Sequence, residues 1–338
     1  MDFSSVIQNI LQRKHLTMNE AQAVLHNIMK GVYTSVQIAA LLVALRMKGE
    51  SAEEIAGFAL EMRRNVKTFT TDSLYLVDTC GTGGDQSGTF NISTASAFVA
   101  SGAGIKIAKH GNRSVSSRCG SADVLEELGV KIDASVDVVE KCLKEVGIAF
   151  FFAPLWHPSM KDVAPIRKEL GIRTIFNILG PLVNPLHVSR QVLGVCDKDI
   201  GLKMAEALLK LGSERAFIVH GRDGLDEVTL TTSTTIIEIR NGKIQTWAFN
   251  PSEFGYSLVN LETLKGEGAS QNAAIIRQIL EGQDQAAKRD IVVINAAFAI
   301  LASGLVRDLN AALVKAKDSI QSGKALEKLN QLIKVSQG

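Results

Sequence analysis

The chain has 338 residues, of which 46% are hydrophobic and 21% charged, and its formal net charge is +2. This composition describes an ordinary soluble globular protein of one large or two ordinary domains. The small net charge gives no electrostatic reason to expect a nucleic-acid partner. No apolar run approaches the roughly 20 residues that span a bilayer, so we also expect no membrane partner.

The four cysteines indicate a reducing compartment. Cys80, Cys119, Cys142 and Cys196 are widely spaced, and none forms a Cys-x-x-Cys motif or has the spacing of a zinc site. The first residues also lack the basic region and apolar core of a signal peptide. We therefore expect a cytoplasmic protein with reduced thiols. Cys80 and Cys119 lie beside the motifs described below, but the sequence places no base that would make either a nucleophile.

Residues 1 to about 72 are predicted to be helical, joined by short links as in an antiparallel bundle. Apolar residues recur at helical spacing from Phe3 to Leu11. The nearly all-apolar segment 38–45 is either deep core or a subunit contact, and we favour core. Three capping boxes predict the next helix starts, at Thr17 with Glu20, Thr34 with Gln37 and Ser51 with Glu54.

From Ser73 onward the pattern changes to alternating strands and helices, which predicts a mostly parallel sheet flanked by helices. A hairpin is expected where residues 233–240 and 243–249 flank Asn241-Gly242. The fold class is therefore α/β, with a smaller all-helical domain at residues 1–72 and an α/β domain at residues 73–338. The predicted strands are 73–79, 104–109, 148–153, 190–196 and 215–220, and the predicted helices are 92–101, 122–128, 136–146 and 197–211, with stops at Gly102, Gly129, Gly147 and Gly212.

Five of the six prolines lie between Pro154 and Pro185, so this segment must be partly irregular. We expect residues from about 160 to 190 to pack against the helical domain or to form the hinge. Within it, Arg167 is a candidate fork for a carboxylate, although a surface salt bridge is an alternative reading. His157 is either a site residue or a histidine that packs a loop.

A glycine-rich turn follows the first predicted strand, in the order Gly81-Thr82-Gly83-Gly84-Asp85. Glycines permit positive φ and close approach to a ligand, and a helix capped by Asn91 should follow. Such a turn before a helix N-terminus favours an anion. The run matches neither the Walker loop nor the dinucleotide fingerprint, because Gln86 stands where the fingerprint requires glycine. The glycines alone leave a phosphate site and a plain tight turn both open.

A second polar segment follows the second predicted strand and favours the phosphate site. It runs Lys109-His110-Gly111-Asn112-Arg113-Ser114-Val115-Ser116-Ser117. Cations, an amide and hydroxyls make a poor core and a good cradle for anionic oxygens. Loops at the carboxyl ends of strands are where open α/β sheets bind ligands, although a solvated loop remains the alternative.

A carboxylate pair, Asp226-Glu227, follows the predicted strand 215–220. Two carboxylates at a strand end suit Mg²⁺, which takes few protein oxygens and keeps waters and substrate phosphates. Most such pairs are simply solvated, so the pair by itself is weak evidence.

Four motifs together resemble the anthranilate phosphoribosyltransferase family. They are the glycine turn 81–85, Thr-Phe-Asn-Ile-Ser-Thr at 89–94, Lys-His-Gly-Asn-Arg-Ser at 109–114 and Gly-Ser-Ala-Asp-Val-Leu-Glu at 120–126. The resemblance covers nearly the whole chain. It implies a nucleoside phosphorylase/phosphoribosyltransferase-like fold and transfer of the 5-phosphoribosyl group from phosphoribosyl pyrophosphate (PRPP) to the amine of anthranilate, the second step of tryptophan biosynthesis. It also implies a homodimer formed through the helical domain.

The resemblance implies a role for each matching residue, with no protein nucleophile and with Lys109 and Mg²⁺-bound groups stabilising the transition state. Mg²⁺ is the implied cofactor, with two ions per monomer, held by Ser93, Asp226 and Glu227. Anthranilate is implied at Gly81, Asn112 and Arg167, with His110 nearby. The residues implied for PRPP are Gly81, Gly84, Asp85, Thr89, Asn91, Ile92, Ser93, Thr94, Lys109, His110, Gly111, Asn112, Arg113, Ser114, Val115, Ser116, Ser117 and Ser121.

Departures from the commonest family pattern occur at Cys80, Gln86 and Ser159, and none replaces an implied contact. Two rival readings stay open at this point. A nucleoside phosphorylase on the same fold would need a base pocket in place of Arg167 and Asn112. A catalytically silent relative that binds nucleic acid or a regulatory ligand would lack the metal or PRPP residues, all of which are present here.

Overall fold

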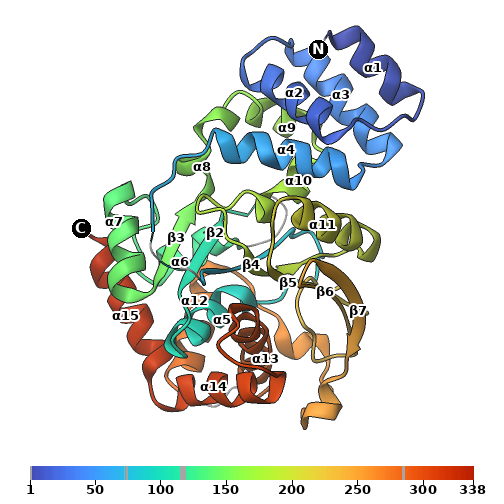
Figure 1. Cartoon of the computed structure of the whole chain (residues 1–338). Coiled ribbons are helices and arrows are strands. Elements are labelled where there is room, and N and C mark those ends of the chain that lie inside the picture. Colours follow the sequence, from blue (N-terminus) through green and yellow to red (C-terminus); the bar gives the residue numbers. More distant parts are fainter. Residues whose placement is uncertain (1, 72, 74, 115–118, 284–285) are drawn as a thin grey trace.

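The computed structural model describes the chain except residues 1, 72, 74, 115–118 and 284–285. Four helices at the N-terminus form a bundle at one end of the molecule (Figure 1). All three predicted capping boxes are confirmed, because Thr17, Thr34 and Ser51 each accept a hydrogen bond from the backbone N–H three residues on, and the Glu or Gln there reaches back. The helices are α1 (Phe3–Leu11), α2 (Met18–Met29), α3 (Ser35–Lys48) and α4 (Ala52–Arg64).

Helix α3 is the apolar centre of this bundle. Its residues Ile38, Leu41, Leu42 and Leu45 are buried, which confirms the prediction that segment 38–45 belongs to the core. Apolar side chains also lie on the opposite side of α3, where Val36 is 79% exposed and Met47 is 78% exposed. The helix therefore has apolar residues facing both the core and solvent.

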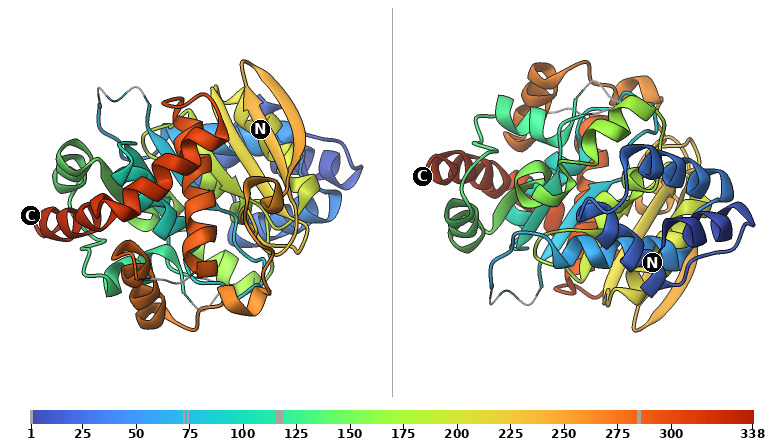
Figure 2. Two further views of the ribbon diagram at one scale, coloured as in Figure 1. Left: turned by 90° about the horizontal axis from the view of Figure 1, so that it is seen from below. Right: turned by 90° about the horizontal axis from the view of Figure 1, so that it is seen from above.

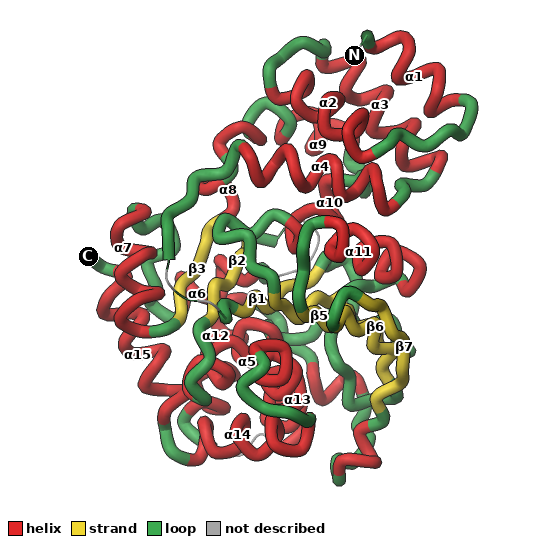
Figure 3. Tube along the Cα trace, in the orientation of Figure 1, coloured by secondary structure: helices red, strands yellow, loops and turns green. Residues whose placement is uncertain are grey.

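A seven-stranded sheet forms the rest of the scaffold, in the order β3-β2-β1-β4-β5-β6-β7 (Figure 3). Strands β1 to β5 are parallel, and β6 and β7 form the predicted antiparallel hairpin beside β5. The α/β fold class with a mostly parallel sheet is thus confirmed. The strands are β1 (Val77–Gly81), β2 (Ile107–Gly111), β3 (Ile148–Phe152), β4 (Arg190–Gly194), β5 (Arg215–Gly221), β6 (Thr234–Arg240) and β7 (Lys243–Phe249).

The two faces of the sheet enter two different cores, because alternate residues of a strand point to opposite faces. Phe217 and Val219 of β5 join the core beneath α5 and α13, whereas Ile218 joins the core of α11 and the N-terminal bundle. Figure 2 shows α13, α14 and α15 gathered on the side away from the bundle. The helices of the α/β region are α5 (Ile92–Gly102), α6 (Ser121–Glu127), α7 (Val136–Lys141), α8 (Ala153–Trp156), α9 (Ala164–Leu170), α10 (Phe176–Leu179), α11 (Lys198–Lys210), α12 (Ala269–Leu280), α13 (Ala286–Ser303), α14 (Leu309–Gln321) and α15 (Lys324–Ser336).

The first two strands are displaced toward the chain's C-terminus from their predicted positions. The prediction of a strand at 73–79 is wrong at its start, since β1 begins at Val77 and runs through Gly81 in register with β4. Strand β2 similarly begins at Ile107, after Gly104 with φ +95°, and includes His110 and Gly111. Lys109 lies in the strand, within its predicted range 104–109, and His110 and Gly111 lie in the strand too, not on the turn after it as predicted.

Helix α5 begins after Asn91 and ends at Gly102, as predicted, but neither residue makes the expected cap. Asn91 precedes α5, but its side chain makes no capping bond; it donates to the carbonyl oxygen of Cys119 instead. Gly102 does not terminate the helix by a left-handed turn. A Cβ at Gly102 would lie 2.3 Å from the Ser319 hydroxyl, so glycine is needed there for close packing. The stops at Gly129, Gly147 and Gly212 are confirmed, each with φ between +85° and +95°.

The proline-containing segment is partly irregular, as predicted, and lies between the sheet and the bundle (Figure 1). Its short helix α9 contacts α3, and α10 contacts α4. Ile166 and Phe176 belong to the same buried cluster as the bundle residues. Among the described residues, no helix combines the length and the apolar character that crossing a membrane requires.

Candidate active site at the carboxyl ends of the strands

The sheet order places a ligand crevice at the end of β1. From β1 the chain proceeds outward to β2 and β3, and then crosses to β4 and β5 on the other side. At such a reversal the connections leave the carboxyl ends of two neighbouring strands in opposite directions, which opens a crevice. The glycine loop that follows β1 lies at this point, and the Thr82 N–H donates to the carbonyl oxygen of Gly194 at the end of β4.

The glycine loop needs its glycines for two different reasons. Gly83 and Gly84 adopt φ +61° and +84°, the left-handed region that glycine occupies without strain. Gly81 is required by a close approach, since a Cβ there would lie 2.7 Å from a carboxylate oxygen of Asp226. The Gly83 N–H donates to that carboxylate at 3.0 Å. The loop is thus built against Asp226.

Lys109 brings a buried cation into the crevice from β2. Its side chain is 3% exposed, and its ammonium donates to the carbonyl oxygen of Thr79 and, at 3.4 Å, to the hydroxyl of Ser93. Burial lowers the pKa of Lys109, while the nearby carboxylates of Asp78 and Glu227 oppose that shift. Ser93, in the first turn of α5, therefore faces both the cation and the carboxylate pair.

The carboxylate pair reaches the crevice by the loop that follows β5. Glu227 accepts a hydrogen bond from the Ser93 N–H at 3.0 Å. Burial, and then the charge of Asp85, raises the pKa of Asp226 to about 7. Burial and the charge of Asp226 likewise raise the pKa of Glu227. Three carboxyl groups that repel one another in a half-buried crevice favour a bound cation.

The donor set fits Mg²⁺. One oxygen of Asp85 is buried without a hydrogen-bond partner, and Asp226 and Glu227 supply hard oxygen donors. Within the described part of the chain, no group of three or more His, Cys, Asp or Glu has the arrangement of a complete metal site. Mg²⁺ takes one or two carboxylates and completes its coordination with waters and substrate phosphates.

The segment after β2 turns back over the start of α6. The Ala122 N–H donates to the carbonyl oxygen of Asn112, and Asp123 accepts from the N–H of Ser114 at 3.1 Å. Arg113 forms ion pairs with Asp123 at 2.9 Å and with Glu126 at 2.8 Å. Its charge is therefore already compensated by α6. Val115, Ser116 and Ser117 lie outside the described residues.

These elements enclose a cavity of about 340 Å³. Arg167 of α9 and both members of the carboxylate pair line it. Thr94 does not, because its side chain is buried in the helix layer. The other predicted PRPP residues that line the cavity are Gly81, Gly84, Asp85, Thr89, Asn91, Ile92, Ser93, Lys109, His110, Gly111, Asn112, Arg113, Ser114 and Ser121.

A second cavity of about 360 Å³ adjoins the first and is more apolar. Phe176, Pro181 and Met62 contribute its apolar wall, and His110, Asn112 and Arg167 line both cavities. The Arg167 guanidinium lies 5.5 Å from the ring centre of Phe176. A planar aromatic acid could place its ring on the apolar wall and its carboxylate at Arg167.

Two buried histidines face each other in this second cavity. The rings of His110 and His157 have centroids 5.1 Å apart, and the Nε2 atoms of both are buried without partners. Burial, and then the charge of His110, lowers the pKa of His157 to about 3. Burial also lowers the pKa of His110. Both rings are therefore neutral near pH 7.

Acid should destabilise the fold through His157. The folded chain keeps this ring neutral down to about pH 3, whereas the unfolded chain takes up a proton near pH 6.5. The unfolded state binds more protons in this window, so the free energy of unfolding falls as the pH is lowered. We expect the free energy of unfolding to fall less between pH 7 and pH 5 in His157→Asn than in the wild type. Urea unfolding at the two pH values measures this difference. An equal fall in the two proteins would contradict the assignment of a neutral, buried His157.

The structure adds residues that sequence reasoning missed. Arg173 and Asn177 line the first cavity from the proline-containing segment, and Asn272 lines it from α12. The Asn272 amide donates to the Asn91 side chain at 2.9 Å and so fixes the start of α5. No local pattern marks Asn272, because it is one of several polar residues on an ordinary helix. Arg173 lies six residues beyond Arg167, and its proximity to the glycine loop exists only in the folded chain.

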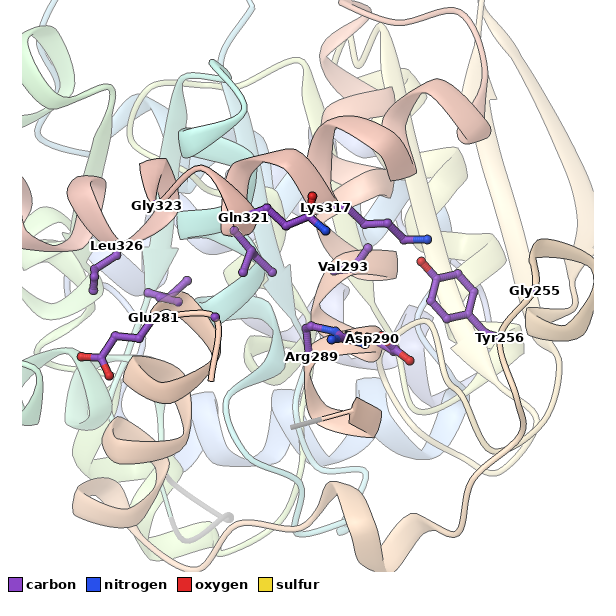
Figure 4. Close-up of a pocket in the computed structure, with 13 residues that line it drawn as sticks. Gly255, Tyr256, Glu281, Arg289, Asp290, Val293, Lys317, Gln321, Gly323 and Leu326 are labelled. Atoms are coloured by element: carbon purple, nitrogen blue, oxygen red, sulfur yellow. Dashed lines mark hydrogen bonds and ion pairs between the residues drawn. The ribbon is translucent and has the colours of Figure 1, made fainter. Parts of the chain in front are cut away.

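A larger cavity of about 740 Å³ lies among α12, α13, α14 and α15 (Figure 4). Arg289 forms an ion pair with Asp290, and the Lys317 ammonium lies 5.1 Å from the ring centre of Tyr256. Of the described residues that line it, none belongs to the glycine loop, the segment after β2 or the carboxylate pair. Size alone therefore does not make it the site.

Two family models define the class of protein. Residues 73–326 match the a/b domain of a glycosyl transferase family, and residues 4–66 match the helical bundle domain of that family. The crevice described above lies almost entirely within the first match. Transfer of a glycosyl group is thus the class of reaction to which this fold and site belong.

Individual relatives specify the family further. The anthranilate phosphoribosyltransferase of Moorella thermoacetica is 52% identical over 97% of this chain and 96% of its own length. That of Pelotomaculum thermopropionicum is 50% identical, over 97% and 95%. The crystal structure of the Thermus thermophilus enzyme matches with a TM-score of 0.93 and 38% identity, over 98% of this chain and 99% of that one. The Saccharomyces cerevisiae enzyme in complex with PRPP and Mg matches with a TM-score of 0.90 and 31% identity, over 99% and 98%. The chain belongs to the anthranilate phosphoribosyltransferase family.

Proposed function

We propose that the chain transfers the 5-phosphoribosyl group of PRPP to the amine of anthranilate, giving N-(5-phosphoribosyl)anthranilate and pyrophosphate. One observation carries this proposal: an anion cavity with a buried lysine and a carboxylate pair adjoins an apolar cavity with an arginine, and the two share a wall. A charged donor substrate and a small aromatic acid can therefore bind side by side. The family of the chain supports the same pairing.

The donor side of the reaction depends on neutralising pyrophosphate. Asp226, Glu227 and Ser93 would hold Mg²⁺, which when bound offsets the negative charge that develops on the leaving group. The ammonium of Lys109 and the N–H group of Gly84 supply further positive charge and a hydrogen-bond donor. The sugar carbon passes through an oxocarbenium-like state as its bond to pyrophosphate breaks. No protein nucleophile is required for this substitution.

The acceptor side depends on position. Arg167 would bind the carboxylate of anthranilate, and Gly81, Asn112 and His110 would direct the amine toward the sugar carbon. Holding a weak aromatic amine against the reacting carbon removes much of the entropic part of the barrier. The neutral rings of His110 and His157 keep this cavity free of additional positive charge.

Arg167→Ala should raise the KM for anthranilate more than the KM for PRPP. The variant removes a fork that would bind the aromatic carboxylate and leaves Lys109 in place. We expect a rise of about tenfold or more, the range for losing a hydrogen bond to a charged group. Steady-state kinetics with each substrate varied in turn measures the effect, and Lys168→Ala, on the exposed side of α9, is the control. Equal changes in the two KM values would exclude Arg167 from the acceptor site.

We further infer two domains, residues 1–72 and 73–338, with the segment from about 160 to 190 as the hinge between them. The contacts of α9 with α3 and of α10 with α4 support this division, since the segment touches the bundle while Arg167 lines the site. Closure about the hinge would bring Arg167 toward the glycine loop. We propose two Mg²⁺ ions per monomer, because three carboxyl groups and a substrate pyrophosphate offer enough oxygen donors for two.

We also propose a homodimer formed through the N-terminal bundle, in the cytoplasm. Val36 and Met47 of α3, together with Leu11 of α1 and Val32, are large apolar side chains that face solvent in the single chain. Cys80, Cys142 and Cys196 are free thiols, as a reducing compartment requires. Light scattering should give twice the mass of one chain, and a monomeric mass at micromolar concentration would contradict the dimer.

A pyrimidine nucleoside phosphorylase is the rival function. It would use inorganic phosphate at the glycine loop and release a base, but the second cavity offers Arg167 and apolar walls that suit an aromatic acid. Purified protein should consume PRPP with anthranilate and should release no base from uridine or thymidine with phosphate. Base release in the absence of PRPP turnover would replace the proposed function by the rival one.

A further inference from the structure

Arg173 contacts the glycine loop from the segment between α9 and α10. Its guanidinium donates to the carbonyl oxygen of Thr82 at 3.3 Å. A Cβ built at Gly84 would lie 1.5 Å from one terminal nitrogen of Arg173 and 2.7 Å from the central carbon of its guanidinium. Any side chain at position 84 would displace this guanidinium, so the glycine permits a cation to lie directly against the loop backbone.

Among the residues that the structure describes, no acidic side chain forms an ion pair with the Arg173 guanidinium. Its one hydrogen bond with a described residue goes to a neutral carbonyl, although a guanidinium has five N–H donors. Arg113, which lines the same cavity, instead forms ion pairs with Asp123 and Glu126. Arg173 is also half-buried, and its charge opposes the upward shift that burial gives the pKa of Cys196. Its remaining donors are therefore available to an anion.

The glycine loop lies between two groups of opposite charge. Gly81 and Gly83 contact the carboxylate of Asp226, while Thr82 and Gly84 contact the guanidinium of Arg173. A substrate anion that binds at the loop together with a metal ion would contact the Asp226 carboxylate through that ion. It would contact the Arg173 guanidinium directly. An arginine fork matches the oxygens of a phosphate group in geometry as well as in charge.

We propose that Arg173 is a further binding residue for PRPP and that its guanidinium contacts the pyrophosphate group at the glycine loop. The proposal deepens the proposed function and rests on it. Arg173 also lines a small cavity of about 120 Å³ with Arg46 and Glu50, which lie at the end of the N-terminal bundle. Arg173 therefore lies between the glycine loop and residues of the bundle, since Thr82, Arg46 and Glu50 line this small cavity with it.

The experiment compares Arg173→Met, which keeps an unbranched apolar stem but removes the guanidinium, with Arg173→Lys, which keeps the charge. Lys168→Met, an exposed cation of the same segment, is the matched control. Calorimetric titration with PRPP and Mg²⁺ gives the affinity, and steady-state kinetics gives the KM for each substrate. We expect Arg173→Met to weaken PRPP binding by about 10- to 100-fold, the effect of losing a charge-assisted hydrogen bond to phosphate. Arg173→Lys should retain part of the affinity, and the control should resemble the wild type.

Two further measurements distinguish a binding role of Arg173 from a purely structural one. If Arg173 binds PRPP, the KM for anthranilate should stay near the wild-type value in Arg173→Met. The dependence of PRPP affinity on salt should also become weaker, because one cation is lost. Unchanged PRPP affinity in Arg173→Met overturns the proposal, as do equal losses for both substrates accompanied by a lower melting temperature. If the wild-type protein binds no PRPP, the proposed function fails as well, whereas failure of the variants alone to differ from wild type leaves that function standing.

Discussion

Replacing Asp226 by Asn together with Glu227 by Gln should abolish Mg²⁺-dependent turnover. The two carboxylates converge in the crevice, and burial raises the pKa of both, which is the electrostatic condition that a bound cation relieves. Amides keep the shape and the acceptor oxygens for Gly83 and Ser93 but lose the charge that holds the metal. We expect kcat/KM to fall by at least about 10³-fold, comparable to the loss of a major group that stabilises transition-state charge. Initial rates over a range of Mg²⁺ concentrations measure the effect.

The same double variant should be no less stable than the wild type when metal is absent. A carboxyl group whose pKa is raised in the folded state opposes folding at a pH above that value, here about 7 for Asp226. Removing both charges removes this opposition, so the free energy of unfolding at pH 8 in a chelator should be equal or higher. Wild-type turnover would contradict the metal assignment. Lost turnover with a large fall in stability would show that the variant fails by misfolding.

Replacing Lys109 by Met should weaken PRPP binding by about 10- to 100-fold, the range for hydrogen bonds to a charged group. Lys109 is 3% exposed and lies beside Ser93 and the carboxylate pair, so its charge acts in a place with little screening by water. A methionine fills a similar volume without the charge. Calorimetric titration with PRPP and Mg²⁺ measures the affinity directly.

Lys106→Met is the matched control for Lys109. Lys106 is exposed, lies three positions earlier and donates to the Ser73 hydroxyl at 2.8 Å, away from the cavity. The control should bind PRPP as the wild type does. Equal affinity of Lys109→Met and wild type would remove Lys109 from the PRPP site.

Local signals in the sequence predicted those elements whose structure is decided locally. The three capping boxes and the Asn241-Gly242 hairpin depend on residues within a few positions of one another, and all were predicted correctly. The start of β1 was not, because its register is decided by pairing with β4, more than a hundred residues later. Asn91 was expected to cap α5, but Asn272 and Cys119, distant in sequence, bind its side chain instead.

The residues of the candidate site could be predicted where they belong to a sequence motif. The glycine loop and the carboxylate pair each follow a strand, and Lys109 lies near the carboxyl end of β2. Parallel pairing brings the carboxyl ends of β1, β2 and β5 to the same edge of the sheet. Arg173 was not predictable, since it stands in an irregular segment and its relation to Gly84 is purely spatial. Thr94 lies in the same motif as Ser93, but the helix turns its side chain into the core.

The most direct test of the account is to mix the purified protein with PRPP, Mg²⁺ and anthranilate and to follow anthranilate and pyrophosphate together. We expect one pyrophosphate to be released for each anthranilate consumed, and we expect a chelator to stop both changes. If PRPP binds but anthranilate is not consumed, the assignment of PRPP to the first cavity is retained, and the assignment of anthranilate to the cavity with Arg167 is wrong. If pyrophosphate appears at the same rate without anthranilate, the central claim of transfer to the aromatic amine is contradicted.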